Sequence, residues 1–209
     1  MKDIGIIDTG LSNIYSVINA FEMLGSSVGT LKVKGDESNF RSIILPGVGS
    51  FKNAMGRLTE SGLDDVIKQS IIDGKPFLGI CLGMQLLLSS SEEFGITQGL
   101  NIVNGNVRKF NFQSKDIHIP HVGWNEVINN NNMLLLKNIQ LNSMFYFVHS
   151  YFVDLGDVKV ITGMTNYAEQ KFISCFEYEN IYATQFHPEK SGKIGIEVCR
   201  NFQKIIKNS

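Results

Sequence analysis

A cysteine between two glycines is the residue of this chain that is best placed for chemistry. Cys81 lies between Gly79 and Gly83, after one apolar run and before another. A nucleophile at a tight turn from a strand into a helix is exposed at the edge of a sheet, and flanking glycines let the backbone make that turn. The positive end of the following helix favours the thiolate, which is the attacking form of cysteine. We therefore predict that Cys81 is a nucleophile.

His187 has the sequence context expected of the residue that acts as acid and base for Cys81. A thiolate that attacks an amide needs a proton donor for the departing nitrogen. His187 ends a predicted strand and is followed by Pro188 and Glu189. Because the rigid proline spaces the two side chains, Glu189 is able to orient the imidazole as the third member of a triad.

The other histidines lack this context. His149 competes for the role of base, but it lies in an apolar strand pattern without an adjacent carboxylate. We predict a half-buried histidine whose hydrogen bonds are satisfied. His118 and His121 frame Pro120 and also lack a nearby carboxylate, which suits surface or structural positions.

The remaining cysteines and a possible metal site are weaker candidates. Cys175 and Cys199 lie within apolar patterns, which is typical of buried core cysteines. A metal site built from Cys81, His187 and Glu189 is an alternative, but no His/Cys pair has the usual ligand spacing. The sequence therefore predicts neither a metal nor another cofactor.

Two backbone segments are candidates for an oxyanion hole. The tetrahedral intermediate of amide attack carries negative charge on the former carbonyl oxygen, which N–H groups stabilise. One candidate is the N–H of Leu82, directly after the nucleophile, and the other comes from the turn Pro46-Gly47-Val48-Gly49. Such a string forms a turn in any case, so alone it is weak evidence.

Five strings together resemble class I glutamine amidotransferases. Gly-Ile-Cys-Leu-Gly-Met-Gln at 79–85 is similar to the nucleophile turn of that family, and Gln-Phe-His-Pro-Glu-Lys at 185–190 to its His/Glu pair. Leu-Pro-Gly-Val-Gly at 45–49, Pro-His-Val-Gly-Trp-Asn at 120–125 and Tyr-Phe-Val-His-Ser-Tyr at 146–151 narrow the resemblance to the glutaminase subunits of imidazole glycerol phosphate synthases. The resemblance covers nearly the whole chain, in the family's order and spacing.

The resemblance implies a role for each matching residue. Cys81 would form a γ-glutamyl thioester, with His187 as acid and base and Glu189 orienting it. Val48 and Leu82 would supply the oxyanion N–H groups. The residues implied to hold L-glutamine are Gly49, Gln85, Ser150 and Tyr151. The residues implied to face a partner are Asn13, Trp124, Tyr146 and Lys190.

The implied partner is a barrel-shaped cyclase subunit in a heterodimer. In that family the ammonia reacts with a phosphoribulosyl aminoimidazole intermediate, which gives imidazole glycerol phosphate and an aminoimidazole carboxamide ribotide in histidine synthesis. Free ammonia at neutral pH is mostly ammonium, so it must travel shielded from water. A chain of 209 residues is too short for a synthase domain beside a glutaminase fold, so we expect the acceptor chemistry on another polypeptide.

Two departures from the family's pattern leave alternatives open. Asp-Thr-Gly-Leu-Ser-Asn at 8–13 stands in place of Asp-Tyr-Gly-x-Gly-Asn, and Val122 in place of a methionine. Both lie near the predicted partner face, so a paralogue that feeds ammonia to sugar amidation for surface polysaccharides is the main alternative. A γ-glutamyl hydrolase without a partner is another. A non-catalytic binding protein is a third, although the intact triad argues against it.

Strand and helix patterns alternate in the first half of the chain, which predicts a mostly parallel sheet flanked by helices. The predicted strands are residues 4–7, 42–45 and 77–80, and the predicted helices are residues 14–24, 63–71 and 81–88, with Ser12 as a candidate cap. The second half predicts strands at 145–152, 158–162, 172–176 and 181–186, a hairpin turn at Asn104-Gly105, a surface turn at 129–132 and a last helix across 196–206. The predicted fold class is therefore α/β with additional antiparallel strands in the second half, in one domain over residues 1–209.

Composition restricts the partners and the compartment. Hydrophobic residues make up 43% and charged residues 19%, and the net charge is −1, as in soluble globular proteins that bind neither nucleic acid nor membranes. The apolar run at 4–7 is too short for a signal peptide or a membrane span. Three widely spaced cysteines form no disulfide framework. We expect a cytoplasmic protein.

Overall fold

The computed structural model describes residues 1–10, 13–35, 37–114, 116–128, 132–156 and 159–209. The predicted cap Ser12, most of the predicted turn at 129–132, and Val158 at the start of a predicted strand lie outside the described residues.

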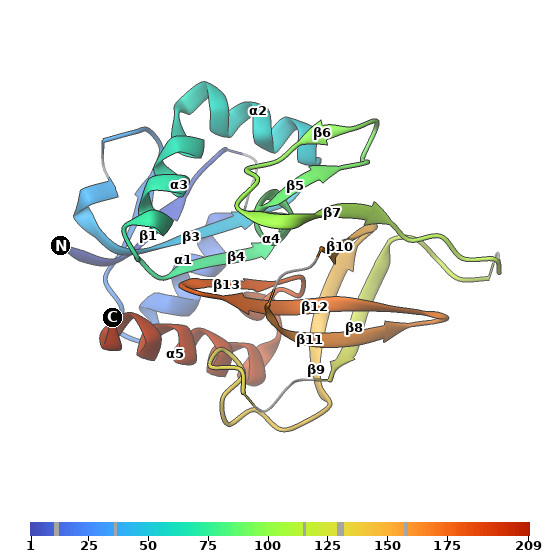
Figure 1. The fold of residues 1–209 in the computed structure, drawn as a ribbon. Helices are drawn as coiled ribbons and strands as arrows, with labels where there is room; N and C mark the ends of the chain where they lie inside the picture. The colour runs from blue at the N-terminus through green and yellow to red at the C-terminus, as the bar shows by residue number, and fades with distance from the viewer. Residues whose placement is uncertain (11–12, 36, 115, 129–131, 157–158) are drawn as a thin grey trace.

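Four N-terminal strands and one strand from near the C-terminus form a parallel sheet in the order β2-β1-β3-β4-β13 (Figure 1). Neighbouring strands in this set are all parallel. Their bounds are β1 (Lys2–Ile7), β2 (Val28–Leu31), β3 (Phe40–Gly47), β4 (Phe77–Cys81) and β13 (Ile181–Thr184). Strands β3 and β4, in the middle of the set, are mostly apolar and almost fully buried because both faces of the sheet are covered there.

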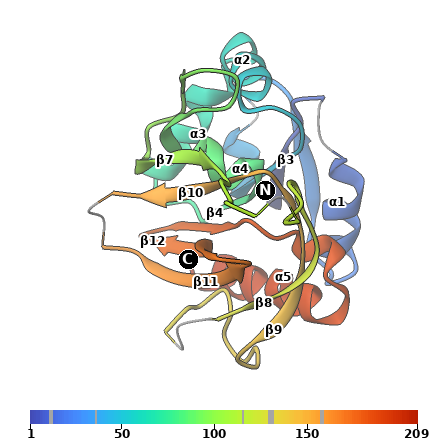
Figure 2. The same cartoon turned by 90° about the vertical axis from the view of Figure 1, so that its right-hand side faces the viewer.

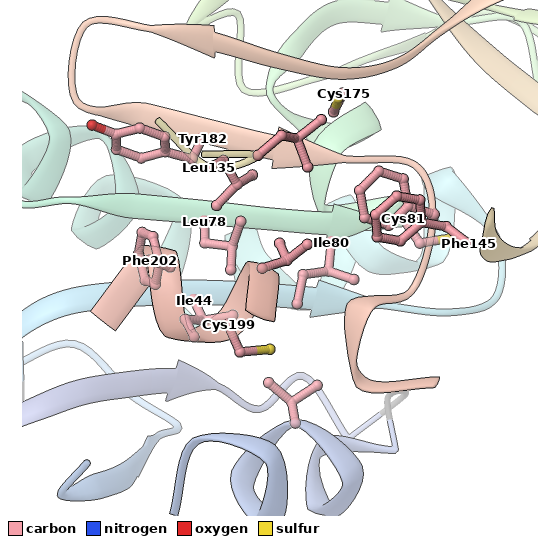
Figure 3. Packing of buried hydrophobic residues seen from close by; sticks show 14 of the residues in the cluster. Ile44, Leu78, Ile80, Cys81, Leu135, Phe145, Cys175, Tyr182, Cys199 and Phe202 are labelled. Atoms are coloured by element: carbon pink, nitrogen blue, oxygen red, sulfur yellow. The ribbon is translucent and has the colours of Figure 1, made fainter. Parts of the chain in front are cut away.

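Helices cover the two faces of this sheet (Figure 1). On one face α1 (Ile14–Glu22) and α5 (Gly192–Asn208) bury an apolar stripe against strand residues such as Ile44, Leu78 and Ile80, as Figure 3 shows for part of this core. On the other face α2 (Phe51–Ser61) and α3 (Leu63–Ile72) pack a second apolar core. No helix among the described residues is both long and apolar enough to cross a membrane.

Antiparallel strands extend the sheet beyond β13. The order continues β12-β10-β7-β5-β6, and β11 also pairs with β12. Within this part only β5 and β7 are parallel. Their bounds are β5 (Leu88–Ser91), β6 (Thr97–Gln98), β7 (Val103–Lys109), β10 (Tyr151–Leu155), β11 (Ile161–Tyr167) and β12 (Gln170–Tyr178). The predicted α/β class with added antiparallel strands is confirmed.

A separate two-stranded ribbon completes the fold (Figure 2). Its strands are β8 (His121–Val127) and β9 (Ser143–His149), which pair from His121↔His149 to Val127↔Ser143. Short 3₁₀ turns, η1 (Glu37–Asn39) and η2 (Pro188–Lys190), lie before β3 and before α5.

Three of the sequence predictions are wrong in detail. The helix predicted at 81–88 is only α4 (Leu82–Leu86), and Leu88 already begins strand β5. Asn104-Gly105 is no hairpin turn: β7 runs through it, Gly105 has φ +151°, and the register with β5 shifts there, so the pair forms an irregularity within a strand. The strand predicted at 145–152 is two strands, because the chain leaves the ribbon at Ser150 and enters the main sheet as β10.

Gly83→Ala tests how tightly α4 packs on the sheet. A Cβ at Gly83 would overlap the carbonyl oxygen of Leu45, so we expect a loss of at least about 3 kcal/mol in the free energy of unfolding, measured by urea denaturation. Gly56→Ala is the matched control, because its Cβ would meet nothing within 4 Å in helix α2. It should stabilise the protein by about 0.5–1 kcal/mol. Equal effects of the two substitutions would contradict close packing of α4.

Candidate active site

Cys81 occupies a strained backbone corner between β4 and α4. Its φ is 54° and its ψ is −108°, a conformation that residues with a side chain rarely adopt and that is often associated with function. The glycines act differently from our prediction. Gly79 and Gly83 do not take positive φ; they are required because a Cβ at Gly79 would lie 2.8 Å from the oxygen of Gly83, and one at Gly83 would collide with β3. Cys81 itself adopts the strained turn conformation, and the two glycines leave room for the helix that follows it to pack closely against the sheet.

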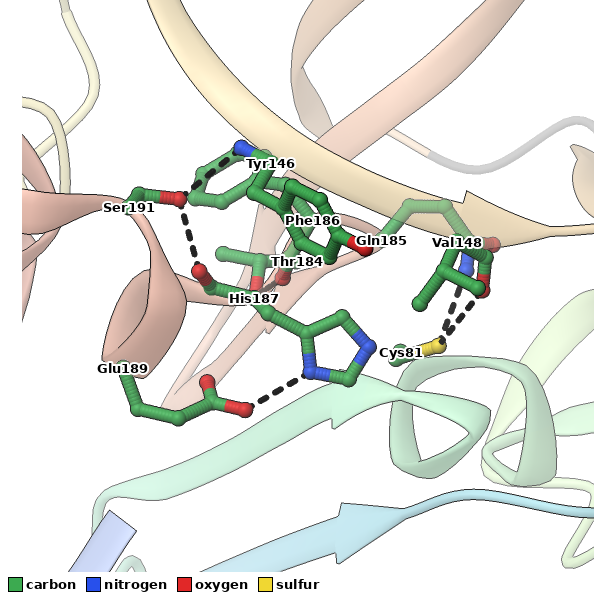
Figure 4. Close-up of polar contacts among 9 residues, drawn as sticks. All are labelled: Cys81, Tyr146, Val148, Thr184, Gln185, Phe186, His187, Glu189 and Ser191. Atoms are coloured by element: carbon green, nitrogen blue, oxygen red, sulfur yellow. Dashed lines mark hydrogen bonds and ion pairs between the residues drawn. The ribbon is translucent and has the colours of Figure 1, made fainter. Parts of the chain in front are cut away.

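The structure brings the three predicted triad residues together (Figure 4). His187 follows β13, the parallel neighbour of β4, so both residues come to the same edge of the sheet. His187 Nδ1 and Glu189 Oε1 are 2.7 Å apart, with side chains only 3% and 5% exposed. The other ring nitrogen, Nε2, is buried, has no other partner among the described residues, and is turned towards the sulfur of Cys81.

This environment favours a charged imidazole. Burial by itself would lower the pKa of His187. The charge interaction and the hydrogen bond with Cys81 outweigh this effect, followed by the hydrogen bond and the charge interaction with Glu189, and they raise the pKa of His187 to about 10. The second carboxylate oxygen of Glu189 is buried without a partner among the described residues. The arrangement therefore places a charged imidazole beside the Cys81 sulfur, where it can give a proton to a leaving group.

A pocket of about 450 Å³ opens over the sulfur. All six residues predicted for the oxyanion hole and for glutamine binding line it, together with Cys81 and His187. The full lining consists of Val48, Gly49, Cys81, Leu82, Gln85, Glu93, Pro120, Val148, His149, Ser150, Tyr151, His187 and Lys190. Gly47 pairs with Cys81 in the parallel register, which explains why the 46–49 turn reaches the nucleophile. Leu82 is the first residue of α4, so its N–H has no partner within the helix.

Two of the four predicted partner-facing residues lie on the ribbon, and the other two line a second cavity. Trp124 and Tyr146 are paired across the ribbon, with ring centroids 6.2 Å apart, and Trp124 is 52% exposed. Asn13 and Lys190 line a second, small cavity of about 20 Å³ that also contacts His187 and Glu189.

His149 belongs to a chain of hydrogen bonds and not to the triad. Its Nδ1 is 2.8 Å from the carbonyl oxygen of Tyr151, which can only accept, so Nδ1 carries the proton. His149 Nε2 therefore accepts from Nδ1 of His121 at 3.0 Å, and His121 Nε2 accepts from the amide of Asn125 at 3.2 Å. The amide of Asn125 is itself fixed because it donates to the carbonyl of Asn166.

Both of these imidazoles are held neutral. Burial lowers the pKa of His121 to about 4, and burial, with smaller opposing and supporting contacts, lowers the pKa of His149 to about 3. The prediction of a satisfied His149 is confirmed, but the residue is buried and not half-buried. His118 is exposed, whereas Cys175 and Cys199 are buried free thiols whose pKa is raised by burial.

Sequence reasoning missed two polar residues of the site, one that lines the pocket and one that is buried beside Cys81. Glu93 lines it and accepts a hydrogen bond from the N–H of Phe51, and nothing in the spacing of Glu93 indicates this position. Gln185 is fully buried, with its amide nitrogen 3.5 Å from the Cys81 sulfur. Its place two residues before His187 was the available signal. Among the described residues, no group of three or more His, Cys, Asp or Glu is arranged to hold a metal ion.

The fold and the site define an α/β protein with a cysteine, a histidine and a glutamate at one edge of its sheet. Comparison with known families identifies the class to which it belongs. The family model described as "Glutamine amidotransferase class-I" matches residues 5–205. The chain therefore belongs to the class I glutamine amidotransferase family, and the resemblance inferred from its motifs is confirmed.

Individual relatives narrow the match within that family. The chain is 43% identical over 205 residues to "Imidazole glycerol phosphate synthase subunit HisH" of Leptospira borgpetersenii, which covers 97% of this chain and 100% of that protein. It is 44% identical over 206 residues to the protein of the same name from Prochlorococcus marinus, with coverage of 99% and 100%. The solved structure of PurLQS from Thermotoga maritima has a TM-score of 0.71 at 19% identity, over 98% of this chain and 99% of that one. At that identity the likeness concerns the fold.

The neutral histidine pair predicts a pH dependence of stability. In the unfolded chain both histidines bind a proton as pH falls below about 6.5. In the folded protein His121 and His149 stay neutral until about pH 4 and about pH 3, respectively. The free energy of unfolding should therefore fall between pH 6.5 and 4, by up to about 1.4 kcal/mol per pH unit for each imidazole. Urea denaturation across this range measures the slope.

A substitution isolates this contribution. His149→Gln should reduce the slope, whereas His118→Gln, at an exposed histidine, should leave it in place. The same slope in all three proteins would show that the buried pair is not the source.

Proposed function

We propose that this protein is the glutaminase subunit of an imidazole glycerol phosphate synthase, with residues 1–209 forming one glutaminase domain. Membership of the class I glutamine amidotransferases and the 39–44% identity to HisH subunits over nearly whole chains support this function. It hydrolyses L-glutamine to glutamate and ammonia, and the ammonia serves the synthesis of imidazole glycerol phosphate and aminoimidazole carboxamide ribotide in histidine biosynthesis. The sugar-amidating alternative is not favoured by these relatives. The observation that carries the chemistry is the placing of Cys81 and the His187–Glu189 pair over one pocket.

The proposed reaction starts from the thiolate and imidazolium pair. The Cys81 sulfur attacks the side-chain amide carbon of glutamine, and the N–H groups of Val48 and Leu82 stabilise the resulting oxyanion. His187 passes its Nε2 proton to the departing nitrogen, which leaves as ammonia. A γ-glutamyl thioester remains on Cys81. His187 then removes a proton from water, which breaks the thioester to glutamate and returns the sulfur as a thiolate. Glu189 keeps the ring oriented throughout.

The remaining pocket residues would hold the amino-acid end of the substrate. Both amide hydrogens of Gln85 are committed, to Tyr151 O at 2.9 Å and to Gln185 Oε1 at 3.0 Å, so its Oε1 is the atom left for the substrate's ammonium group. Glu93 adds negative charge on the same side. Gly49, Ser150 and Tyr151 line the rest of the pocket as backbone and hydroxyl groups suited to the carboxylate.

The proposed partner is a barrel-shaped cyclase that binds over Asn13, Trp124, Tyr146 and Lys190 as a heterodimer in the cytoplasm. An exposed Trp124 beside exposed Val122 is the kind of aromatic and apolar surface that interfaces use as an anchor. The small cavity between His187 and Asn13 connects the catalytic residues with this face. Neither nucleic acid nor a membrane has a role in this proposal.

Cys81→Ala separates amide hydrolysis from synthesis. In the complex with the cyclase, the variant should lose glutamine-dependent formation of imidazole glycerol phosphate by at least about 1,000-fold, because no thioester forms. Synthesis from added ammonium salt should persist, because the cyclase is untouched. Glutamine-dependent turnover by the variant would refute the assignment of the nucleophile.

Trp124→Ala tests the interface. We expect the affinity for the cyclase to fall by at least about 2 kcal/mol, or roughly 30-fold in Kd, as for a central aromatic anchor. Isothermal titration calorimetry measures the change. Ile72→Ala is the matched control, because Ile72 is 76% exposed at the end of α3, just before β4 begins at the opposite edge of the sheet from Cys81. Comparable losses in both variants would place the interface elsewhere.

A further inference from the structure

Gln185 is a buried polar group that the triad mechanism does not use. Its residue is 0% exposed, and its amide nitrogen lies 3.5 Å from the Cys81 sulfur. Figure 4 shows the sulfur in contact with this amide and, at 3.9 Å, with the carbonyl oxygen of Val148, while the His187 imidazole lies on another side. A buried amide needs a partner, and a donor aimed at sulfur is best satisfied when that sulfur is negative.

The direction of the Gln185 amide is fixed by its surroundings. The carbonyl of Tyr151 can only accept, so the atom of Gln85 that lies 2.9 Å from it is the amide nitrogen. The second hydrogen on that nitrogen goes to Gln185 Oε1 at 3.0 Å. The other end of the Gln185 amide, which faces Cys81, must therefore be its NH₂ group.

The backbone of Gln185 is held as firmly as its side chain. Its N–H donates to the carbonyl of Ser174 on β12 at 2.8 Å, and the hydroxyl of the preceding Thr184 donates to the carbonyl of Phe186 at 3.0 Å. Cys81 itself is 7% exposed, so few water molecules can solvate its charge. The Gln185 amide donor is already fixed in place, so it replaces these water molecules without any rearrangement when charge forms on the sulfur.

We propose that Gln185 is a positioning residue whose amide N–H, oriented through Gln85 by the Tyr151 carbonyl, holds the Cys81 sulfur as a thiolate in line with the pocket. This inference rests on the proposed role of Cys81 as nucleophile. His187 gives up its proton during the reaction, whereas the neutral Gln185 donor is present at every stage. It stabilises the thiolate both before attack and when the thioester breaks down.

The test is the rate of Cys81 alkylation by iodoacetamide as a function of pH, followed by mass spectrometry. Gln185→Met fills the same space without a donor, so the rate at neutral pH should fall by about 10- to 100-fold, the loss expected for one hydrogen bond to a charged group. The pH at half-maximal reactivity should move upwards. In the complex with the cyclase, kcat for glutamine should fall by a similar factor with little change in KM, while ammonium-dependent synthesis is unchanged.

A second variant guards against simple misfolding. Gln185→Glu keeps the acceptor for Gln85 but places a carboxylate beside the sulfur, so alkylation at neutral pH should slow further. Gln203→Met is the matched control: Gln203 is another buried glutamine, which donates to Leu24 O and Ser26 Oγ far from the site. It should lose stability with no change in the pH profile.

The outcomes separate this inference from the proposed function. If Cys81 reacts in the wild type and Cys81→Ala is inactive, but Gln185→Met keeps the wild-type pH profile and kcat, the role of Gln185 is refuted and the nucleophile stands. If the wild type shows no glutaminase activity with its cyclase and no selective labelling of Cys81, the proposed function itself fails.

Discussion

The close approach of helix α4 to the end of strand β3 is the constraint on which the site depends. A Cβ at Gly47 would lie 2.8 Å from the Cβ of Leu82, and one at Gly83 would overlap the Leu45 carbonyl. With the helix seated this closely, the chain can leave β4 only through a corner at Cys81, which takes the positive φ. The two parallel neighbours of β4 then supply the rest: β3 brings the Val48 turn and β13 brings Gln185 and His187. Carboxyl ends of parallel strands meet at one edge of a sheet, so three separate segments converge there.

The pKa of each buried imidazole at the pocket depends on the groups that it contacts. His187 and His149 are both buried, yet their pKa values move in opposite directions. His187 faces a carboxylate and a sulfur, both of which gain from a positive charge. His149 faces a carbonyl oxygen and the neutral His121 ring, and burial dominates. Because His149 stays neutral, His187 is the charged one of these two imidazoles.

The sequence was sufficient for the parts of the fold that depend on local pattern. Continuous apolar runs identified β1, β3 and β4, and 3.6-residue periodicity identified α1, α3 and α5. The Cys81, His187 and Glu189 set was recognisable because glycine and proline mark the backbone around it. Helix α2 was missed because glycine and polar residues dilute its apolar face. The break at Ser150 was missed because His149 and Tyr151 continue an apolar string, and only pairing with two different sheets divides it. Glu93 could not be assigned because its place comes from a contact distant in the chain, whereas Gln185 offered one local signal, its place two residues before His187.

The ribbon links the proposed partner face to His187 through hydrogen bonds of the backbone and of Ser191. The carbonyl of Tyr146 accepts from the N–H of His187 at 3.0 Å, and the N–H of Tyr146 donates to the hydroxyl of Ser191. That hydroxyl in turn donates to the carbonyl of His187 at 2.7 Å. Tyr146 is paired with Trp124, and three residues further along β9 lies His149, whose ring fixes the Tyr151 carbonyl. Because the middle of β9 is bonded to the backbone of His187, a partner that shifts the strand at Tyr146 must also move His187 or break this hydrogen bond. The geometry of the ribbon thus gives the proposed partner a direct mechanical route to His187.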